Sequence, residues 1–255
     1  KEKEKKSDDQ KEIEEKQVHP YLQPIVDCDG KIIGAEALIR WDHPKEGFLQ
    51  PETFIPTFER NGMIADLDKY IWRSACEILS TWTGKKSNLF ISINISPKDF
   101  LFMDVFAEIN ALIKEFKIEP SRLRIEITET VMMTEVENRM AILNRFRESG
   151  FIVEMDDFGS GYSSLNQLKD MPLDVLKIDM KFLSSSKNSQ KAEIILRNVL
   201  KLSGDLGLSS LTEGVETEDQ YNMLSQMGCN LFQGYFFAKP MTVNEFEKVC
   251  DSRVA

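Results

Sequence analysis

Short apolar runs of β type alternate along this chain with longer segments that have the spacing of amphipathic helices. Such alternation is typical of repeated strand and helix units, whose strands pair in a mainly parallel sheet. The predicted strands are residues 21–26, 31–39, 89–95, 123–128, 151–155, 175–178, 208–211 and 229–232. The predicted helices include residues 66–82, 105–116, 136–149, 192–206 and 218–227. The pattern therefore predicts an α/β domain.

The number of strands favours a closed barrel over an open sheet. About eight strands with covering helices in roughly 235 residues suit a TIM-like (β/α)8 barrel, and an open sheet of the same elements stays the alternative. Only a tight turn at residues 27–30 separates the first two runs. A connection this short makes a hairpin, so we predict one antiparallel strand near the N-terminus.

The first 18 residues differ in composition from the rest of the chain. They carry charges of both signs and almost no apolar periodicity, so we expect residues 1–18 to be a charged linker or the end of a helix from an upstream domain. Residues 19–255 are then one barrel domain. The N-terminus lacks the apolar core of a secretory signal, and no apolar run reaches membrane-spanning length.

The residue inventory narrows the chemistry. The whole chain holds two histidines, His19 and His43, and four scattered cysteines without a Cys-x-x-Cys pair, which disfavours histidine-based or thiolate metal sites and indicates a reducing cytoplasm. The formal net charge of −10 disfavours binding to a nucleic-acid polymer. Carboxylates must therefore carry any catalysis.

Polar side chains occur where the predicted strands end. They are Asn94, Glu126, Glu129, Asp156, Asp157, Lys177, Asp179, Glu213, Glu216 and Gln233. In a (β/α)8 barrel the C-terminal strand ends converge on one face, where the active sites of such barrels lie. Acids crowded there repel one another unless cations neutralise them. Oxygen ligands without histidine or cysteine favour hard divalent ions, so we predict a Mg²⁺ or Mn²⁺ site.

The adjacent acids Asp156 and Asp157 suggest two metal ions. One carboxylate of such a pair can bridge both ions while the next binds only one, and two ions can clamp the attacking and leaving oxygens of a phosphodiester. Lys177, at a neighbouring strand end, could orient the attacking water or stabilise charge on the phosphoryl oxygens. This arrangement predicts phosphodiester hydrolysis.

A series of motifs resembles the EAL-domain phosphodiesterases. In order they are Glu36-Ala37-Leu38, Asn94, Glu126-Ile127-Thr128-Glu129, Asp156-Asp157-Phe158-Gly159-Ser160-Gly161-Tyr162-Ser163-Ser164, Leu176-Lys177-Ile178-Asp179, Glu213-Gly214-Val215-Glu216 and Gln233-Gly234-Tyr235. The resemblance covers about residues 20 to 250. It implies a barrel that hydrolyses the bacterial second messenger cyclic di-GMP to linear pGpG with two Mg²⁺ or Mn²⁺ ions.

The resemblance also implies a role for each matched position. Glu36, Asn94, Glu126, Asp156, Asp157 and Glu213 correspond to metal ligands. Glu213 can equally be read as a general base, and this alternative stays open. Lys177 would touch the attacking water, and Glu216 would hold its neighbours by hydrogen bonds.

Further positions match substrate and regulatory contacts of the family. Gln23, Arg40, Gln233 and Tyr235 correspond to contacts with guanine or phosphate, and Arg40 suits bidentate phosphate pairing. Residues 159–164 resemble the family's dimerisation loop, which Glu129 would anchor. The resemblance therefore implies a homodimer, and a GGDEF or sensor domain upstream. The expected location is the cytoplasm, or the cytoplasmic side of a larger and membrane-bound protein.

The chain departs from the family pattern at two positions, and two other functions are less consistent with its residues. Thr212 and Met180 stand where the family usually has Ala and Arg, but neither corresponds to a metal ligand. Some relatives bind cyclic di-GMP without cleaving it, as receptors or interaction modules, and these usually lack a ligand or the lysine, whereas this chain has them all. A phosphodiesterase for lipid headgroups is disfavoured because such enzymes commonly use histidines. Trp41, Phe48, Phe54 and Phe58 are predicted to pack helices onto the barrel rather than to stack on nucleobases.

Overall fold

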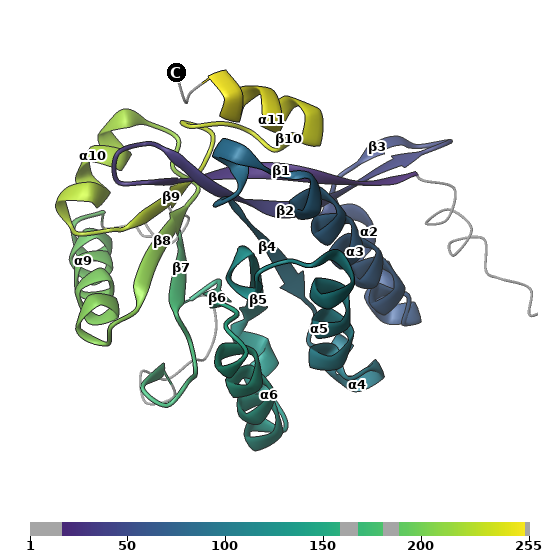
Figure 1. Cartoon of the computed structure of the whole chain (residues 1–255). Coiled ribbons are helices and arrows are strands. Elements are labelled where there is room, and N and C mark those ends of the chain that lie inside the picture. Colours follow the sequence, from purple (N-terminus) through teal and green to yellow (C-terminus); the bar gives the residue numbers. More distant parts are fainter. Residues whose placement is uncertain (1–16, 159–167, 181–188, 253–255) are drawn as a thin grey trace, which may run out of the picture.

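The computed structural model describes residues 17–158, 168–180 and 189–252, and within them eight strands close into a barrel (Figure 1). The order around the barrel is β1-β9-β8-β7-β6-β5-β4-β2, and the ring closes where β2 pairs with β1. The strands are β1 (Val18–Asp27), β2 (Ile32–His43), β4 (Phe90–Ile95), β5 (Leu123–Thr128), β6 (Val153–Asp156), β7 (Val175–Asp179), β8 (Ser209–Glu213) and β9 (Leu231–Gln233). The predicted TIM-like barrel is confirmed.

The first strand runs against the others, as the short turn predicts. β1 is antiparallel to both of its barrel neighbours, β2 and β9, whereas the remaining neighbours in the ring are parallel. In the turn, Asp27 Oδ1 accepts hydrogen bonds from the amides of Asp29 at 3.0 Å and Lys31 at 2.9 Å. Gly30 has a φ of 73°, which only glycine adopts readily. The N-terminal end of β1 therefore lies beside the C-terminal ends of the other strands.

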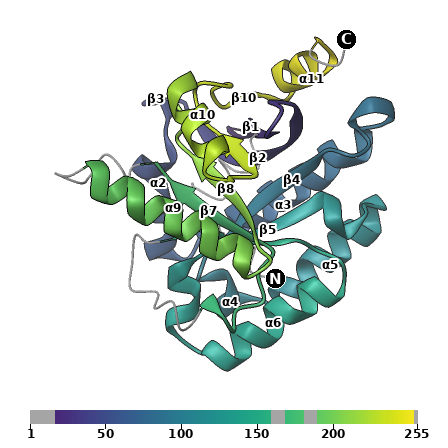
Figure 2. The ribbon, with the colours of Figure 1, turned by 90° about the vertical axis from the view of Figure 1, so that its left-hand side faces the viewer.

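Helices cover the outside of the barrel (Figures 1 and 2). The five predicted helices are α3 (Ile64–Thr81), α5 (Val105–Phe116), α6 (Val136–Glu148), α9 (Ser189–Asp205) and α10 (Glu218–Gln226). Elements that were not predicted are α2 (Pro51–Asn61), α4 (Asp99–Phe102), α11 (Val243–Ser252), the 3₁₀ turns η1 (Gly84–Lys86), η2 (Pro120–Arg122) and η3 (Glu129–Met133), and the short strands β3 (Gly47–Leu49) and β10 (Met241–Thr242). β3 pairs with β2, and β10 pairs with β1. No helix in these ranges is long and apolar enough to cross a membrane.

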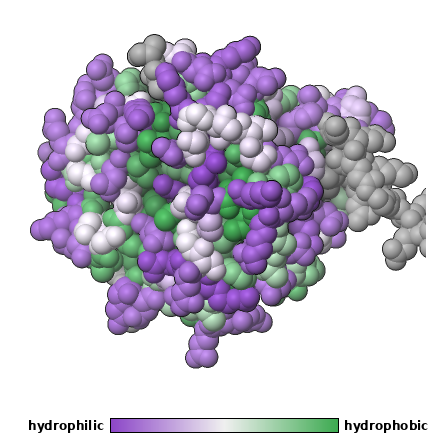
Figure 3. All heavy atoms as spheres, viewed as in Figure 1, coloured by the Kyte–Doolittle hydropathy of each residue, from purple (hydrophilic) through white to green (hydrophobic). Residues whose placement is uncertain are grey.

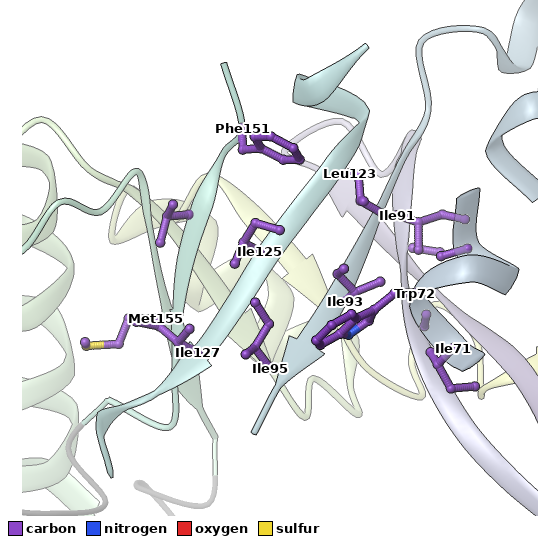
Figure 4. Packing of buried hydrophobic residues seen from close by; sticks show 14 of the residues in the cluster. Ile71, Trp72, Ile91, Ile93, Ile95, Leu123, Ile125, Ile127, Phe151 and Met155 are labelled. Carbon is purple, nitrogen blue, oxygen red and sulfur yellow. The ribbon is translucent and has the colours of Figure 1, made fainter. Parts of the chain in front are cut away.

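Side chains along each barrel strand alternate between the helices and the interior. On β4 and β5, the outward residues are isoleucines and a leucine, and Ile71 and Trp72 of α3 pack beside those of β4 (Figure 4). These outward side chains are almost completely buried. Hydrophobic burial of this kind holds the helices against the barrel, while the molecular surface seen in Figure 3 is mainly hydrophilic.

The barrel interior is apolar at one end and polar beyond it. Ile25, Phe90, Val175 and Leu211 form a separate apolar cluster near the N-terminal ends of the parallel strands. One layer further, Glu154 accepts hydrogen bonds from Ser92 Oγ at 2.9 Å and from Arg124 Nη1 at 2.8 Å. The apolar cluster occupies this end of the interior, and the polar side chains beyond it lie toward the opposite mouth.

One aromatic prediction is wrong. Trp41, Phe54 and Phe58 are buried and contact one another, as predicted, with ring centroids 5.3 to 5.7 Å apart. Phe48, in contrast, is 47% exposed. It lies opposite Asp42 in the β2–β3 ladder, one position away from Trp41. Because neighbouring residues on a strand point to opposite faces, Phe48 cannot share the helix-facing side with Trp41.

Candidate active site

The ammonium group of Lys177 lies among four carboxylates inside the mouth of the barrel. Lys177 Nζ donates to Glu126 Oε1 and lies 2.5 Å from Glu213 Oε1. Glu36 Oε2 is 3.7 Å away and Asp156 Oδ1 is 3.8 Å away. Lys177 is 1% exposed, and Glu126 is completely buried. Four acids around one lysine leave an excess of negative charge where water is scarce.

The strands deliver these side chains in register. Asp156 and Glu213 are the last residues of β6 and β8, and Lys177 lies in the middle of β7. Asn94 of β4 pairs with Glu126 of β5, which places their side chains on the same side of the sheet. Parallel strands in a closed barrel therefore bring together residues that are far apart in the sequence.

Burial and mutual repulsion shift the pKa values of the cluster. Burial raises the pKa of Glu213, Asp156 and Glu36 add to this effect against the opposing effect of Lys177, and the resulting pKa is about 8. Burial also raises the pKa of Glu126 well above its usual range, helped by Glu36. Burial alone would lower the pKa of Lys177, but the four carboxylates outweigh it and hold that pKa well above its usual range. Bound divalent cations would reduce this repulsion among the carboxylates.

The donor atoms fit hard divalent cations. Glu36, Glu126 and Glu213 each offer a carboxylate oxygen within 4.8 Å of the others. Among the described residues, the buried Glu126 Oε2 has no hydrogen-bond partner. Asn94 lies close by, since its Nδ2 donates to Glu36 Oε1 at 3.1 Å. An all-oxygen set with an unsatisfied buried carboxylate oxygen suits Mg²⁺ or Mn²⁺.

Three further predicted residues lie around this cluster in different ways. Asp157 is exposed next to Asp156, has a φ of 55°, and donates its amide to Asp156 Oδ1 at 2.7 Å. Glu216 is exposed before α10, and its amide donates to Gln220 Oε1 at 2.7 Å, so the structure does not bring its side chain to Lys177. Glu129 is buried at the start of η3. The loop that it is predicted to anchor, residues 159–164, falls outside the described residues, so that role stays a prediction.

Gln23 and Gln233, which are predicted to touch substrate, also form hydrogen bonds around Glu36. Gln233 Nε2 donates to Glu36 Oε2 at 2.7 Å and lies 3.2 Å from Gln23 Oε1. Gln23 Nε2 lies 3.4 Å from the carbonyl oxygen of Ala238. Both glutamines are buried, at 9% and 3% exposure for Gln23 and Gln233. In this structure they orient the Glu36 carboxylate from beneath it.

The other two predicted substrate contacts lie at the mouth. Arg40 is on β2, four residues beyond Glu36 and on the same face of the strand. Tyr235 follows β9 and is 57% exposed. Gly234, before it, has no room for a side chain, because a Cβ atom there would lie 2.1 Å from the carbonyl oxygen of Val215. This close contact between Gly234 and Val215 fixes the backbone position just before Tyr235.

Helix α3 positions Asn94 through residues that the sequence patterns did not single out. Trp72 Nε1 donates to the carbonyl oxygen of Asn94 at 3.0 Å. One turn earlier on α3, the buried Asp68 faces the buried Asp99, which accepts a hydrogen bond from the amide of Ser96 at 2.8 Å. Burial raises the pKa of Asp99 to about 6 and that of Asp68 well above its usual range. From these raised pKa values we expect the two acids to share a proton at neutral pH and to hold the turn after Asn94.

The stability of the Asp68→Asn variant relative to wild type should increase as the pH rises. A folded-state pKa above the unfolded value contributes stability at low pH, and this stability is lost as the pH rises through the folded pKa. Asparagine keeps a donor for Asp99 and has no proton to lose. The charged neighbours Glu59 and Lys69 are unchanged. We expect the melting temperature of Asp68→Asn to exceed that of wild type by about 3 °C at pH 8 and by less at pH 5.

The matched control is Asp66→Asn, at an exposed position on the same helix. Its melting temperature should differ from wild type by the same small amount at both pH values. An Asp68→Asn difference that does not grow between pH 5 and pH 8 would contradict the shared proton.

Comparison with known proteins assigns the chain to a family. The family model described as "EAL domain" matches residues 7–240. The chain belongs to the EAL domain family. Its Glu36-Ala37-Leu38 motif accordingly lies on β2 with the glutamate inside the barrel and both apolar neighbours within the same strand.

Curated relatives of this EAL domain include two proteins of Pseudomonas aeruginosa. A cyclic di-GMP phosphodiesterase of Pseudomonas aeruginosa is 34% identical over 230 residues, which cover 90% of this chain and 39% of the relative. MucR of the same organism, a bifunctional diguanylate cyclase and cyclic di-GMP phosphodiesterase, is 32% identical over 235 residues, 91% of this chain and 34% of the relative. The chain thus spans little more than a third of the length of these relatives.

Solved structures share the whole barrel. The Pseudomonas aeruginosa MucR phosphodiesterase in complex with cyclic di-GMP has a TM-score of 0.88 and 32% identity, covering 94% of this chain and 98% of that chain. An EAL domain protein of Listeria monocytogenes has a TM-score of 0.80 and 30% identity, covering 95% of this chain and 96% of that chain. Both similarities extend over the strands that carry the carboxylates.

Proposed function

We propose that this EAL domain hydrolyses cyclic di-GMP to linear pGpG with two divalent cations, Mg²⁺ or Mn²⁺. The observation that carries the proposal is the Lys177 ammonium group among four carboxylates at the mouth of the barrel. The family membership and the names of the relatives, which include cyclic di-GMP phosphodiesterases, point to the same substrate.

The proposed ligands of the cations are Glu36, Asn94, Glu126, Asp156, Asp157 and Glu213. When bound, the cations would polarise the phosphodiester and lower the pKa of a water molecule. Gln233 and Gln23 keep Glu36 oriented toward them through the hydrogen bonds described above. With the acids engaged by cations, Lys177 can hold the attacking water by its ammonium hydrogens.

Proton movement has two candidate routes in this proposal. Glu213 can serve as general base or as a metal ligand, and the raised pKa makes its carboxylate a stronger base than that of an exposed glutamate. Glu216, which is exposed before α10, is proposed to hold its neighbours by hydrogen bonds. Arg40 and Tyr235 at the mouth are proposed to contact the phosphate or guanine of the substrate.

The wider setting follows from the family rather than from the geometry. We place the reaction in the cytoplasm, where cyclic di-GMP signals in bacteria, and a GGDEF or sensor domain upstream would regulate it. Val18 already belongs to β1, so the barrel begins one residue earlier than predicted. Residues 1–16 are proposed as a linker. A homodimer through the helices near residues 157–164 remains a prediction, since residues 159–164 lie outside the described ranges.

Purified protein should convert cyclic di-GMP to pGpG in the presence of Mg²⁺ or Mn²⁺, and a chelator should abolish the conversion. Chromatography of the nucleotides before and after incubation measures both substrate and product. A chelated sample to which Mn²⁺ is added back in excess is the control, and it should regain activity. If the protein binds Mn²⁺ and cyclic di-GMP but produces no pGpG, the receptor function is correct and hydrolysis is not.

A further inference from the structure

We propose that Tyr21, Leu38 and Phe48 form a ledge on which one nucleobase of the substrate stacks. The ledge rests on the proposed function, because it extends the same site and takes a purine base of the same cyclic dinucleotide. Its three residues come from β1, β2 and β3, the strands that rise above the mouth on one side.

The strand register places the ledge directly above the carboxylates. In the β1–β2 ladder, Gln23 pairs with Glu36, and the next pair on the same face is Tyr21 with Leu38. Residues directly opposite each other in an antiparallel pair share a face, and the next pair on that face lies about 7 Å further along the strands. A group that reaches Glu36 from solvent therefore passes Tyr21 and Leu38.

Phe48 extends the same face outward. It pairs with Asp42, which is two residues beyond Arg40 and so lies on the Arg40 face. The rings of Tyr21 and Phe48 have centroids 5.7 Å apart and are tilted by 59°. Phe48 is 47% exposed, and Tyr21 and Leu38 are partly exposed. Apolar side chains with this much exposed surface, beside a polar site, are suited to contact a flat apolar ligand.

Arg40 lies near both this ledge and Tyr235. Its guanidinium carbon is 5.9 Å from the centroid of the Tyr21 ring. Tyr235 also lies close enough to Arg40 to interact with it electrostatically, and Lys239 Nζ is 5.3 Å from the Tyr235 ring centroid. The mouth thus combines aromatic side chains with an arginine. A cyclic dinucleotide offers the matching groups, which are two flat bases and a phosphodiester ring.

Stacking of a nucleobase explains the exposed ring of Phe48 better than packing against a helix does. The helix-facing side of the same strands already holds Trp41, whose ring contacts Phe54 and Phe58 of α2. Phe48 has no part in that cluster, because it points to the other face. Base stacking on an aromatic side chain is tolerant of base identity, so the ledge should strengthen binding of purine dinucleotides without selecting guanine over adenine.

The test compares Phe48→Ala and Phe48→Trp with the control Phe102→Ala, which removes another exposed phenylalanine, from α4. Phe48→Ala should raise the KM for cyclic di-GMP about tenfold and leave kcat within about twofold. Phe48→Trp keeps a ring and should have a KM near that of wild type. Phe102→Ala should change neither constant. Tyr21→Leu should raise KM in the same direction as Phe48→Ala.

The possible outcomes distinguish a failure of the proposed ledge from a failure of the proposed hydrolysis. An active wild type with an unchanged KM in both Phe48→Ala and Tyr21→Leu overturns the ledge and leaves hydrolysis standing. A wild type that binds cyclic di-GMP without turnover overturns hydrolysis, and calorimetric dissociation constants in Mn²⁺ then replace KM, again with a tenfold loss expected for Phe48→Ala. A wild type that neither cleaves nor binds cyclic di-GMP overturns both.

Discussion

Glu126→Gln should lower the rate of cyclic di-GMP hydrolysis by about a thousandfold or more while the barrel stays folded. Loss of a group that only supports a metal ligand commonly costs 10- to 100-fold, and Glu126 is placed here as a ligand itself. Glutamine keeps the shape of the side chain and its contact with Lys177. It also removes a carboxyl group whose charged form is disfavoured by burial and by Glu36. In chelator, the melting temperature should therefore not fall, whereas the increase caused by Mn²⁺ in wild type should largely disappear.

Glu154→Gln is the matched control for this experiment. Glu154 pairs with Glu126 in the β5–β6 ladder and is equally buried, but it bonds Ser92 and Arg124 in the layer beneath. Its replacement should lower stability through the lost contacts with Arg124 and keep the Mn²⁺-dependent increase in melting temperature. Nucleotide chromatography and thermal denaturation with and without Mn²⁺ measure both effects. Near-normal turnover in Glu126→Gln would remove Glu126 from the proposed metal site.

Lys177→Met should be the most destabilising change in the absence of metal. Methionine fills a similar volume but leaves Glu126, Glu213, Glu36 and Asp156 without the cation among them. Removing one partner of a buried ion pair typically costs about 3–5 kcal/mol, because the remaining charge stays buried. Turnover should also fall by orders of magnitude, since no other side chain in the cluster is a cation.

Divalent ions should reverse part of this loss of stability. Mn²⁺ can neutralise the acids in place of the ammonium group, so we expect Mn²⁺ to raise the melting temperature of Lys177→Met more than that of wild type. Lys201→Met, at an exposed position on α9, is the control and should behave like wild type. Equal stability of Lys177→Met and wild type in chelator would mean that the four carboxylates do not depend on Lys177. A small turnover loss would contradict its proposed role at the attacking water.

Periodicity predicted the strands best where burial is continuous. β5 was predicted as residues 123–128 and occupies the same residues, because its outward side chains are all apolar. β2 was predicted to end at residue 39 but continues to His43. Its last residues are polar or aromatic, and they are extended because they pair with β3. That pairing depends on a hairpin, which hydrophobic periodicity does not detect.

Helix α2 was missed for a related reason. Proline usually argues against a helix, and this helix contains Pro51 at its start and Pro56 inside it. Proline is well tolerated in the first turn, where its missing N–H has no helical partner. The apolar side chains Phe54 and Phe58, one helical turn apart, were the signal for a buried helix face.

The candidate site was predictable to the extent that it depends on strand ends. Asn94, Asp156 and Glu213 stand at or next to the ends of apolar runs, and a barrel brings such ends together whatever the loops do. Glu36 was found only through its motif, because it lies within β2. Its support by Gln23 and Gln233 depends on the register between strands about 200 residues apart, which a single sequence does not reveal. Asp68 and Asp99 were missed because each looks like an ordinary surface acid until burial is known.

The reversed first strand also decides where the polypeptide enters the barrel. Val18 pairs with Trp41 near the end of β2, and the carbonyl oxygen of Gln17 accepts a hydrogen bond from the amide of Asp42 at 2.8 Å. In a barrel of eight parallel strands the chain would enter at the opposite end, next to the apolar cluster that contains Phe90 and Val175. Here a displacement of the backbone before Gln17 would first move β1, which carries Tyr21 and Gln23. It would not have to be transmitted through the core.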